Sequence, residues 1–261
     1  MTTLHPSTAG FGAALQHYRS ARRLSQLELA LACDVSAKHV SFLESGRAQP
    51  SREMVARLGA GLLLPLGARN KLLQAAGFAP IFPTSPMNSV AVEPFREILN
   101  EMIAKHAPNP AMVVDRHWTV QEANNSSRTL LDALQGDGSE TNIVRLLTSG
   151  PQVATVIANL PEVLSELMSR VQLEALEAGD DQDFQELIAL LERATARYPR
   201  AAATTGQPIL PLVVNYGDRQ LRFVTAIAHF GSSEDVNVRD LRLELLFPAD
   251  AETRAAIADW G

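Results

Sequence analysis

The stretch from Ser25 to Gly46, SQLELALACDVSAKHVSFLESG, constrains the fold of this chain more than any other segment. Ser25 is a favourable N-cap, and Glu28 three residues later completes a capping box, so a helix is predicted to begin here. Asp34 then falls in a tight turn that favours a left-handed residue, which Asp tolerates at some cost. Ser36 can cap a second helix directly afterwards. The segment is therefore predicted to form two short helices joined by a tight turn.

The two helices are predicted to pack on each other through their apolar residues. Leu27, Ala30 and Leu31 recur at helical spacing in the first, while Val40 and Leu43 point to the core from the second. The side chains left outward or at the edge of the second helix are Ala37, Lys38, His39, Ser41 and Phe42. Short polar and basic groups on an exposed helix suit the major groove of DNA. The alternative interpretation is a small helical domain used for protein contacts.

Charge is distributed unevenly along the 261 residues. Residues 1–80 hold 9 Lys and Arg against 4 Asp and Glu, a net charge of +5, whereas residues 81–261 hold 14 against 25, a net charge of −11. A basic N-terminal part followed by an acidic remainder is typical of a DNA-binding domain attached to a second domain that does not itself lie on DNA.

Three further helices are expected around the first two. Apolar residues at helical spacing predict one from Phe11 to Arg23, and Arg19 near its end could reach a DNA phosphate. Gly46 can end the second motif helix in a left-handed conformation. Pro50-Ser51 and Pro65 then each begin another helix. Five helices in about 70 residues indicate one compact domain, which we place at residues 1–78.

These residues resemble the phage-repressor-like (XRE) family of bacterial regulators. The matching positions are Leu24-Ser25-Gln26, Leu29-Ala30, Val35-Ser36, Val40-Ser41, Glu44, Gly46-Arg47 and Pro50-Ser51. The resemblance implies a DNA-reading surface made of Gln26, Ser36, Ala37, Lys38, His39, Ser41 and Phe42, with Arg47 and Arg19 on phosphates. Repressors of this kind often carry Gln where Ala37 stands, and Ala offers only a methyl contact to thymine. The operator sequence therefore does not follow from the resemblance.

A proline-bearing segment, residues 79–94, is interpreted as a linker that is either extended or partly packed. Beyond it, residues 95–261 predict a helix from Phe95, strands at 111–115 and 118–122, a helix after Asn124, and two long amphipathic helices. Three strands follow within residues 209–247, and a short helix ends the chain. An antiparallel sheet with helices packed on one side, the layout of a PAS-type sensor domain, is expected. The fold class is α+β.

The second domain resembles the ligand-binding domain of MmyB-like regulators. The matching segments are PAMVVDRHWTVQEANNSS, NIVRLL, PLVVNYGDRQLRFVTAIAHFGSSEDV and LRLELLFPADAET, with Asp250 and Thr253 kept near the end. The resemblance implies a transcriptional regulator with a fatty-acid-like ligand and no other cofactor. We expect the cavity that holds the ligand to be lined by Met112, Val114, Trp118, Leu164, Phe223, Thr225, Ile227 and His229, with Leu160, Val163 and Leu167 nearby. Arg222, His229 or Arg145 could meet its head group. His229 is more commonly a core residue, and side chains could fill the cavity.

Other functions find little support in the sequence. One cysteine, Cys33, excludes a disulfide framework, and no phosphate loop, nucleophile motif or metal-ligand spacing indicates an enzyme. The acid cluster Asp180, Asp181 and Asp183 is interpreted as helix capping. No secretory signal or membrane span is visible, so we expect a cytoplasmic protein without membrane contacts.

The function predicted from these features is a homodimeric regulator whose partners are double-stranded DNA and a small hydrophobic ligand. The alternative is an interaction or scaffold protein whose second domain only dimerises. Discrete salt-sensitive sites on the genome would separate the two.

Overall fold

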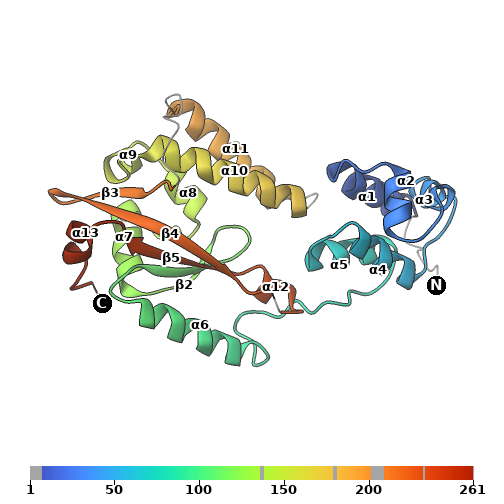
Figure 1. Cartoon of the computed structure of the whole chain (residues 1–261), viewed down its shortest axis with the longest axis horizontal. Helices are drawn as coiled ribbons and strands as arrows, with labels where there is room; N and C mark the ends of the chain where they lie inside the picture. The colour runs from blue at the N-terminus through green and yellow to red at the C-terminus, as the bar shows by residue number, and fades with distance from the viewer. Residues whose placement is uncertain (1–7, 136–137, 179–180, 201–208, 232, 261) are drawn as a thin grey trace. The chain divides into compact units, whose positions relative to one another are not determined.

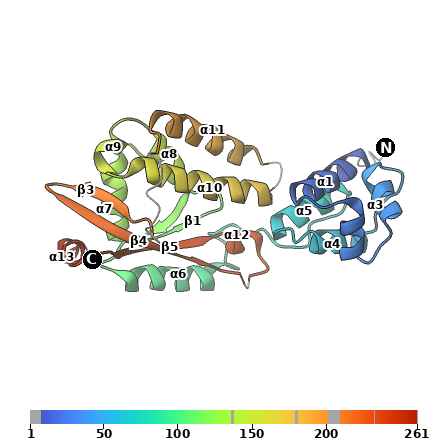
Figure 2. The same ribbon diagram turned by 45° about the horizontal axis from the view of Figure 1, so that its top comes forward.

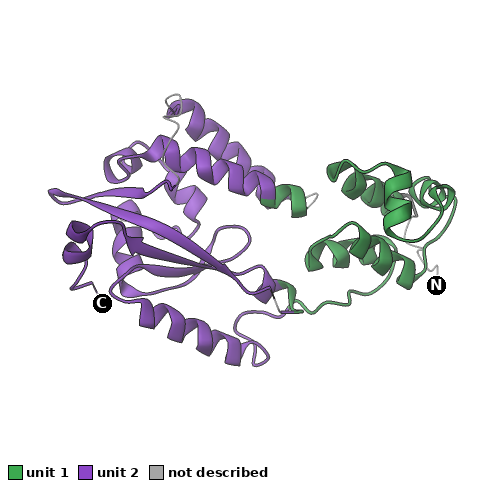
Figure 3. Ribbon diagram, in the orientation of Figure 1, with its two compact units in different colours: residues 1–84, 174–181, 234–236 green, residues 85–173, 182–233, 237–261 purple. Residues whose placement is uncertain are grey.

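The computed structural model of the chain describes residues 8–135, 138–178, 181–200, 209–231 and 233–260. The chain divides into two compact units (Figure 3): one comprises residues up to 84 with the short segments 174–181 and 234–236, and the other comprises the rest. The first is helical and the second contains a sheet, which confirms the predicted α+β class (Figure 1). Among the described residues, no helix has both the length and the hydropathy needed to cross a membrane.

The first unit contains the five helices that the sequence predicted. They are α1 (Thr8–Ala21), α2 (Gln26–Ala32), α3 (Ala37–Glu44), α4 (Arg52–Gly61) and α5 (Leu66–Ala75). Ser25, Ser36 and Ser51 each cap a helix by accepting a hydrogen bond from the backbone N–H three residues on. Asp34 and Gly46 have φ values of 50° and 72°, so both predicted left-handed positions are confirmed. Side-chain capping thus defines where three of the helices begin.

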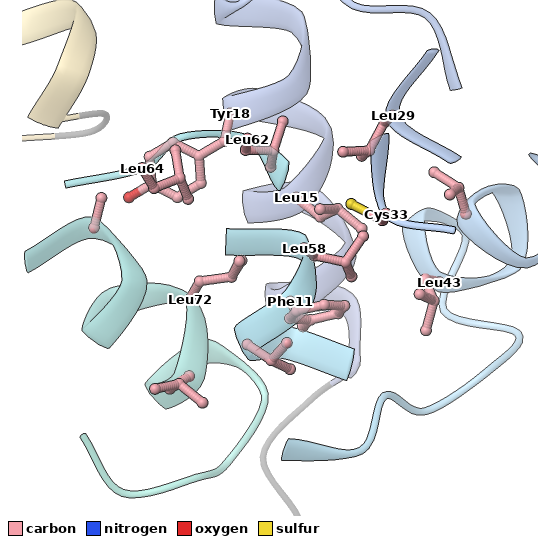
Figure 4. Close-up of a cluster of buried hydrophobic side chains, with 14 of the residues drawn as sticks. Phe11, Leu15, Tyr18, Leu29, Cys33, Leu43, Leu58, Leu62, Leu64 and Leu72 are labelled. Atoms are coloured by element: carbon pink, nitrogen blue, oxygen red, sulfur yellow. The ribbon is translucent and has the colours of Figure 1, made fainter. Parts of the chain in front are cut away.

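The core of this unit draws on all five helices (Figure 4). The labelled side chains are Phe11, Leu15, Tyr18, Leu29, Cys33, Leu43, Leu58, Leu62, Leu64 and Leu72. The prediction that Leu27 and Leu31 face the core is wrong, since their exposed fractions are 59% and 73%. Helix α2 instead buries Leu29, Ala30 and, just beyond its end, Cys33, whose thiol pKa is raised by burial.

Helices α1 and α3 touch at Gly12. A Cβ atom built on Gly12 would overlap the carbonyl oxygen of Glu44, at the end of α3. A glycine is therefore required for the backbones to approach this closely. The contact fixes the end of α3 against α1.

The predicted linker, residues 79–94, has no helix or strand until α6 begins at Glu93. Its start is held by the buried side chain of Asn70. The amide nitrogen of Asn70 donates to the carbonyl of Phe82 at 2.8 Å, and its amide oxygen accepts from the N–H groups of Ile81 and Phe82 at 3.1 Å. This part of the segment is packed rather than free.

The second unit is built on one five-stranded antiparallel sheet. Its strands are β1 (Ala111–Val114), β2 (Val120–Ala123), β3 (Leu212–Tyr216), β4 (Arg219–His229) and β5 (Arg242–Pro248), in the order β2-β1-β5-β4-β3. Gly217, with φ of 61°, lies in the hairpin turn between β3 and β4. Strand β3 pairs only with residues 219–223, so the second half of β4 has no β3 partner.

Helices cover both faces of this sheet, which corrects the expectation of helices on one side (Figures 1 and 2). Helix α6 (Glu93–His106) packs Leu99 and Ile103 against β1 and β5 on one face. The opposite face carries α7 (Asn125–Gln135), α8 (Ile143–Thr148), α9 (Val153–Val156), α10 (Leu160–Ala178) and α11 (Gln182–Arg197). Short helices α12 (Val236–Arg239) and α13 (Ala251–Ala256) lie near the end of the chain. Of the predicted acid cluster, Asp180 is outside the described residues, while Asp183 lies in the first turn of α11.

Candidate DNA-reading helix and ligand cavity

Helix α3 presents the side chains that the sequence predicted for DNA. Ser36 is exposed and caps the helix, its hydroxyl accepting a hydrogen bond from the N–H of His39 at 3.1 Å. Val40 and Leu43 are buried, and Ala37 packs partly against the core. Lys38 is exposed, whereas His39, Ser41 and Phe42 are partly exposed. The helix therefore keeps one side in the core and offers the other side to a partner.

A small cationic surface surrounds Phe42. The ammonium of Lys38 lies 5.5 Å from the centre of the Phe42 ring, and the guanidinium of Arg47 lies 5.8 Å from it. Both cations thus share one aromatic side chain. Gly46 turns the chain so that the Arg47 N–H can donate to the carbonyl of Phe42 at 2.8 Å. This geometry brings Arg47, which follows the helix, back beside the reading residues.

Two of the residues predicted for DNA, Arg19 and Gln26, make hydrogen bonds within the domain. The guanidinium of Arg19 donates to both carboxylate oxygens of Glu44, at 2.6 and 3.0 Å, and to the carbonyl of Leu24 at 2.7 Å. The amide of Gln26 donates to Glu44 at 2.7 Å. The Glu44 side chain is only 5% exposed, and its hydrogen bond raises the pKa of Arg19. Arg19 therefore neutralises a buried carboxylate, and its side chain is only 12% exposed.

Glu44 is the residue whose role the sequence did not reveal. It is an acid at the end of a helix that is expected to approach DNA, which is unfavourable unless a cation is paired with it. The sequence signal for this role was an acidic residue near the DNA-reading helix, which requires a cation beside it. Arg19 and Gln26 come from α1 and the start of α2, and their convergence on Glu44 depends on the packing of three helices.

In the second unit, an apolar cavity of about 390 Å³ lies between the sheet and the helices of one face. Five predicted residues line it: Met112, Val114, Trp118, Thr225 and Ile227. Val163 and Leu167, also expected nearby, line it from α10. The strand register explains the sheet side of the lining, because Thr225 pairs with Leu246 and Ile227 pairs with Glu244. Paired residues of antiparallel strands point to the same face.

Three predicted residues are not part of the lining. Leu164 is buried on α10 but is not part of the lining. Phe223 shares the strand face of Thr225 but is buried farther along, opposite Pro248. His229 is exposed at the other end of β4, opposite Arg242. The cavity thus spans only the middle of β4, at Thr225 and Ile227.

Leu160 and the predicted head-group partners also lie elsewhere. Leu160 is buried outside the lining. Arg145 lines a second, polar cleft and pairs with Glu186. Arg222 is exposed, and its backbone N–H donates to the hydroxyl of Thr253 at 2.9 Å. Asp250 caps α13 by accepting from the Thr253 N–H at 2.7 Å, so both residues of the resemblance have a structural role here.

Much of the lining was missed by sequence reasoning. It comes from α7, α8, the end of α9, α10, the segment that leads into β3, and β5, and three of the residues are charged: Leu130, Leu131, Leu134, Ile143, Leu146, Leu147, Ile157, Glu166, Arg170, Ile209, Leu210, Pro211, Leu212, Glu244 and Leu246. The spacing of the three leucines of α7 predicts a buried face, but it does not distinguish a cavity wall from a filled core.

One end of the cavity is polar and is organised around Trp118. Its indole is buried, and two guanidinium groups lie near the ring, Arg170 at 4.4 Å and Arg242 at 4.2 Å from the ring centre. The residue has φ of 67°, a strained conformation for an aromatic side chain. The carboxylate of Asp115 holds this turn by accepting the N–H groups of His117 and Thr119, at 2.9 and 3.0 Å.

Comparison with known proteins finds a family match for each of the two units. The model of the MmyB-like transcription regulator ligand binding domain matches residues 95–259, and a helix-turn-helix domain model matches residues 11–72. An uncharacterized HTH-type transcriptional regulator of Mycobacterium tuberculosis (strain H37Rv) is 29% identical over 217 residues, which cover 76% of this chain and 78% of the relative. A regulator of the same description from Mycobacterium bovis matches equally well.

Among solved structures, the clp gene regulator ClgR from C. glutamicum is 34% identical over 27% of this chain and 88% of its own, with a TM-score of 0.24. The family model of the second domain covers more than half of the chain, and the helix-turn-helix model covers the first unit's five helices almost completely. The chain therefore belongs to the MmyB-like transcription regulators, which join a helix-turn-helix DNA-binding domain to an MmyB-like ligand-binding domain.

Proposed function

We propose that this regulator senses a small hydrophobic molecule with an aliphatic chain like that of a fatty acid, and that the bound molecule changes its affinity for DNA. The observation that carries the proposal is the apolar cavity of about 390 Å³ with one polar end. Its volume falls within the range of small-molecule sites, and a few polar groups in an apolar lining are typical of such sites. No chemical reaction is part of the proposal.

On the DNA side, we propose that Lys38, His39 and Ser41 contact base edges while Arg47 contacts phosphate. Lys38 and Arg47 are exposed and lie on either side of Phe42, whose partly exposed ring can contact a thymine methyl group. Ala37 is partly packed against the core, so it contributes a methyl surface at most. Specificity then depends mainly on Lys38 and His39.

We further propose a homodimer that reads two half-sites about one helical turn, roughly 34–36 Å, apart. In this scheme residues 1–78 read DNA, residues 79–94 connect, and residues 95–261 bind ligand and dimerise. A ligand can shift DNA binding only through different affinities for two states of the protein. Those two states would differ in the spacing of the two reading helices.

Native mass spectrometry of the purified full chain tests the ligand and the dimer together. We expect a dimer mass and an additional mass from a co-purified apolar molecule, lost when the protein is delipidated by organic extraction and refolding. A genomic footprint in the source cell tests the DNA side, and discrete salt-sensitive sites are expected. A footprint without such sites would support a scaffold protein, and a protein that binds no apolar molecule would contradict the sensing role.

A further inference from the structure

The second half of strand β4 forms an unpaired edge of the sheet. Strand β3 pairs with residues 219–223 of β4, whereas β5 continues to pair as far as His229, so β4 extends beyond β3 (Figure 1). The chain before β3 leaves the sheet at Pro211, which has no N–H group and whose carbonyl accepts from the side chain of Asn159 at 2.8 Å. Within the described part of the chain, residues 225–229 therefore have a neighbouring strand on one side only.

The backbone groups at this edge are the ones that a further strand would use. The N–H and the carbonyl of Arg222 bond to residues that follow β5 in the chain, so they point to the β5 side of the strand. Because backbone groups alternate in direction along an antiparallel strand, those of Thr225, Ile227 and His229 point away from β5. Among the described residues, these outward groups have no hydrogen-bond partner.

The edge lacks the features that prevent edge strands from pairing with another chain. Such edges are blocked in many proteins by charged side chains, by proline or by a bulge. Residues 224–228, VTAIA, contain no charge and no proline, and their register with β5 runs without a bulge. Residues 81–261 carry 14 Lys and Arg against 25 Asp and Glu, a net charge of −11. An uncharged edge is therefore a place where two copies of an acidic domain can meet without opposing like charges.

A second copy of the chain fits this edge in one register. Outward-pointing backbone groups must face each other, and a two-fold axis at Ile227 achieves this over the whole free stretch, with about six backbone hydrogen bonds. Ile227 then faces Ile227 of the second copy, and Thr225 faces its His229. Shifting the axis by one residue would either oppose His229 to Phe223, which already pairs with β3, or leave Thr225 without a partner strand.

The face of the sheet that carries α6 supports the same partner. Ala226 and Ala228 lie on this face, because the β5 residues that pair with them pack against α6. The two-fold axis is perpendicular to the joined sheet, so both copies of α6 lie on one face of it. The side chains of Ile98 and Met102 on α6 are 56% and 38% exposed. They provide apolar surface that the paired copy can cover above the small alanines.

We propose that two copies of this protein associate through β4, forming one continuous antiparallel sheet with the two-fold axis at Ile227. This inference rests on the proposed homodimer, and it adds the surface through which the dimer forms. Thr225 and Ile227 also line the cavity, so the interface lies at the margin of the ligand site. Ligand binding and dimerisation are then linked through the same strand.

Removing one backbone N–H from the edge tests the pairing. His229→Pro removes an N–H that points away from β5, and proline is tolerated at such edge positions. His229 does not line the cavity, and His229→Ala, which loses the side chain but keeps the N–H, is the matched control. Sedimentation equilibrium of the full chain gives the dissociation constant of the dimer. We expect His229→Pro to raise this constant at least about tenfold above that of His229→Ala, because two symmetry-related hydrogen bonds are lost. Equal constants for the two variants would overturn pairing through β4.

A charge in the middle of the edge provides a second test, which decides if His229→Pro fails to fold. Ala226→Lys places an ammonium group close to its own copy across the two-fold axis, so the dissociation constant should again rise at least about tenfold. Gln220→Lys adds the same charge to β4 where β3 covers the edge, and it should leave the constant unchanged. If Ala226→Lys dimerises as tightly as the unmodified chain, the dimer forms through another surface. If the unmodified chain is a monomer at every concentration, the interface and the homodimer both fail, while the ligand-sensing role is still judged by the co-purified mass.

Discussion

At the scale of single residues, the surface around Phe42 combines one base-reading candidate with one phosphate-contact candidate. Lys38 projects from the reading helix, whereas Arg47 follows the left-handed Gly46. A base contact discriminates between sequences, and a phosphate contact supports binding to all sequences alike. Substituting each residue should therefore give two different signatures.

Lys38→Ala should weaken the free energy of binding to the preferred operator by about 1–3 kcal/mol. It should change binding little for operators altered at the base pair that Lys38 contacts. Arg47→Ala should weaken binding to all sequences and reduce the slope of log affinity against log salt by about one. Fluorescence anisotropy with the footprinted operator and its single-base variants measures both effects. Lys105→Ala, an exposed lysine on α6 of the other unit, is the control for lost charge. The groove assignment is wrong if neither substitution changes either quantity.

For Arg19, the predicted effect of substitution is a loss of stability of the first unit. Arg19→Ala leaves the carboxylate of Glu44 buried without its cation, which should lower the free energy of unfolding of the first unit by about 3–5 kcal/mol. Hydrogen exchange of the α1–α3 amides in the full chain measures this loss. Arg57→Ala breaks an exposed ion pair with Glu53 and should cost less than about 1 kcal/mol. A variant at Arg19 that keeps its stability but loses DNA affinity would restore the phosphate assignment.

The residue-scale contacts that the sequence did not predict have one physical origin. Arg19 and Gln26 were placed on the correct helices, but their partner Glu44 comes from a third helix. Spacing along the chain identifies which residues share a helix face, yet it does not identify which distant side chain arrives opposite them. For the same reason, the sequence did not predict the hydrogen bond from Arg170 on α10 to Glu244 on β5.

At the scale of elements, caps and turns were the most predictable features. Ser25, Ser36 and Ser51 cap their helices as expected because a cap depends on neighbours within a few residues. Burial was predicted less well. The exposed Leu27 and Leu31 on α2 satisfy helical spacing, and so do the exposed Ile98 and Met102 on α6. Each helix offers two overlapping apolar stripes, and the tertiary packing selects one.

The capping box of α2 should make the first unit sensitive to acid. The carboxylate of Glu28 accepts a hydrogen bond from the Ser25 N–H at 2.6 Å, which lowers its pKa below the usual range. A lowered pKa in the folded state contributes stability at pH values above the unfolded pKa of about 4.3, and this contribution disappears as the pH falls through the folded pKa.

Glu28→Gln should therefore make the protection of the α2 amides less dependent on pH in the acid range. Hydrogen exchange, corrected for the intrinsic pH dependence of exchange, measures this protection. The α6 amides in the same samples are the internal control and should respond identically in both proteins. An unchanged acid dependence of α2 would show that the box contributes nothing to stability.

At the scale of the whole molecule, the sequence predicted a helical first part and a second part built on an antiparallel sheet. The charge contrast, the helical start and the strand-rich end all depend on composition and local pattern. The location of the cavity could not be predicted, because the strands are apolar on both faces. Leu99 and Ile103 of α6 pack against one face of the sheet, and the opposite face lines the cavity. Which face lines the cavity therefore depends on where α6 packs.

We propose that ligand binding in the cavity of the second unit controls DNA binding by the first. The dissociation constant of the full chain for its footprinted operator, measured with and without a saturating amount of an apolar ligand such as octanoate, tests this coupling. Coupling between two sites of a regulator is typically about 5- to 150-fold. Ile227→Trp, which fills the cavity from β4, should abolish the response. We predict a change within that range in the unmodified protein, and an identical DNA affinity with the ligand bound would contradict the account.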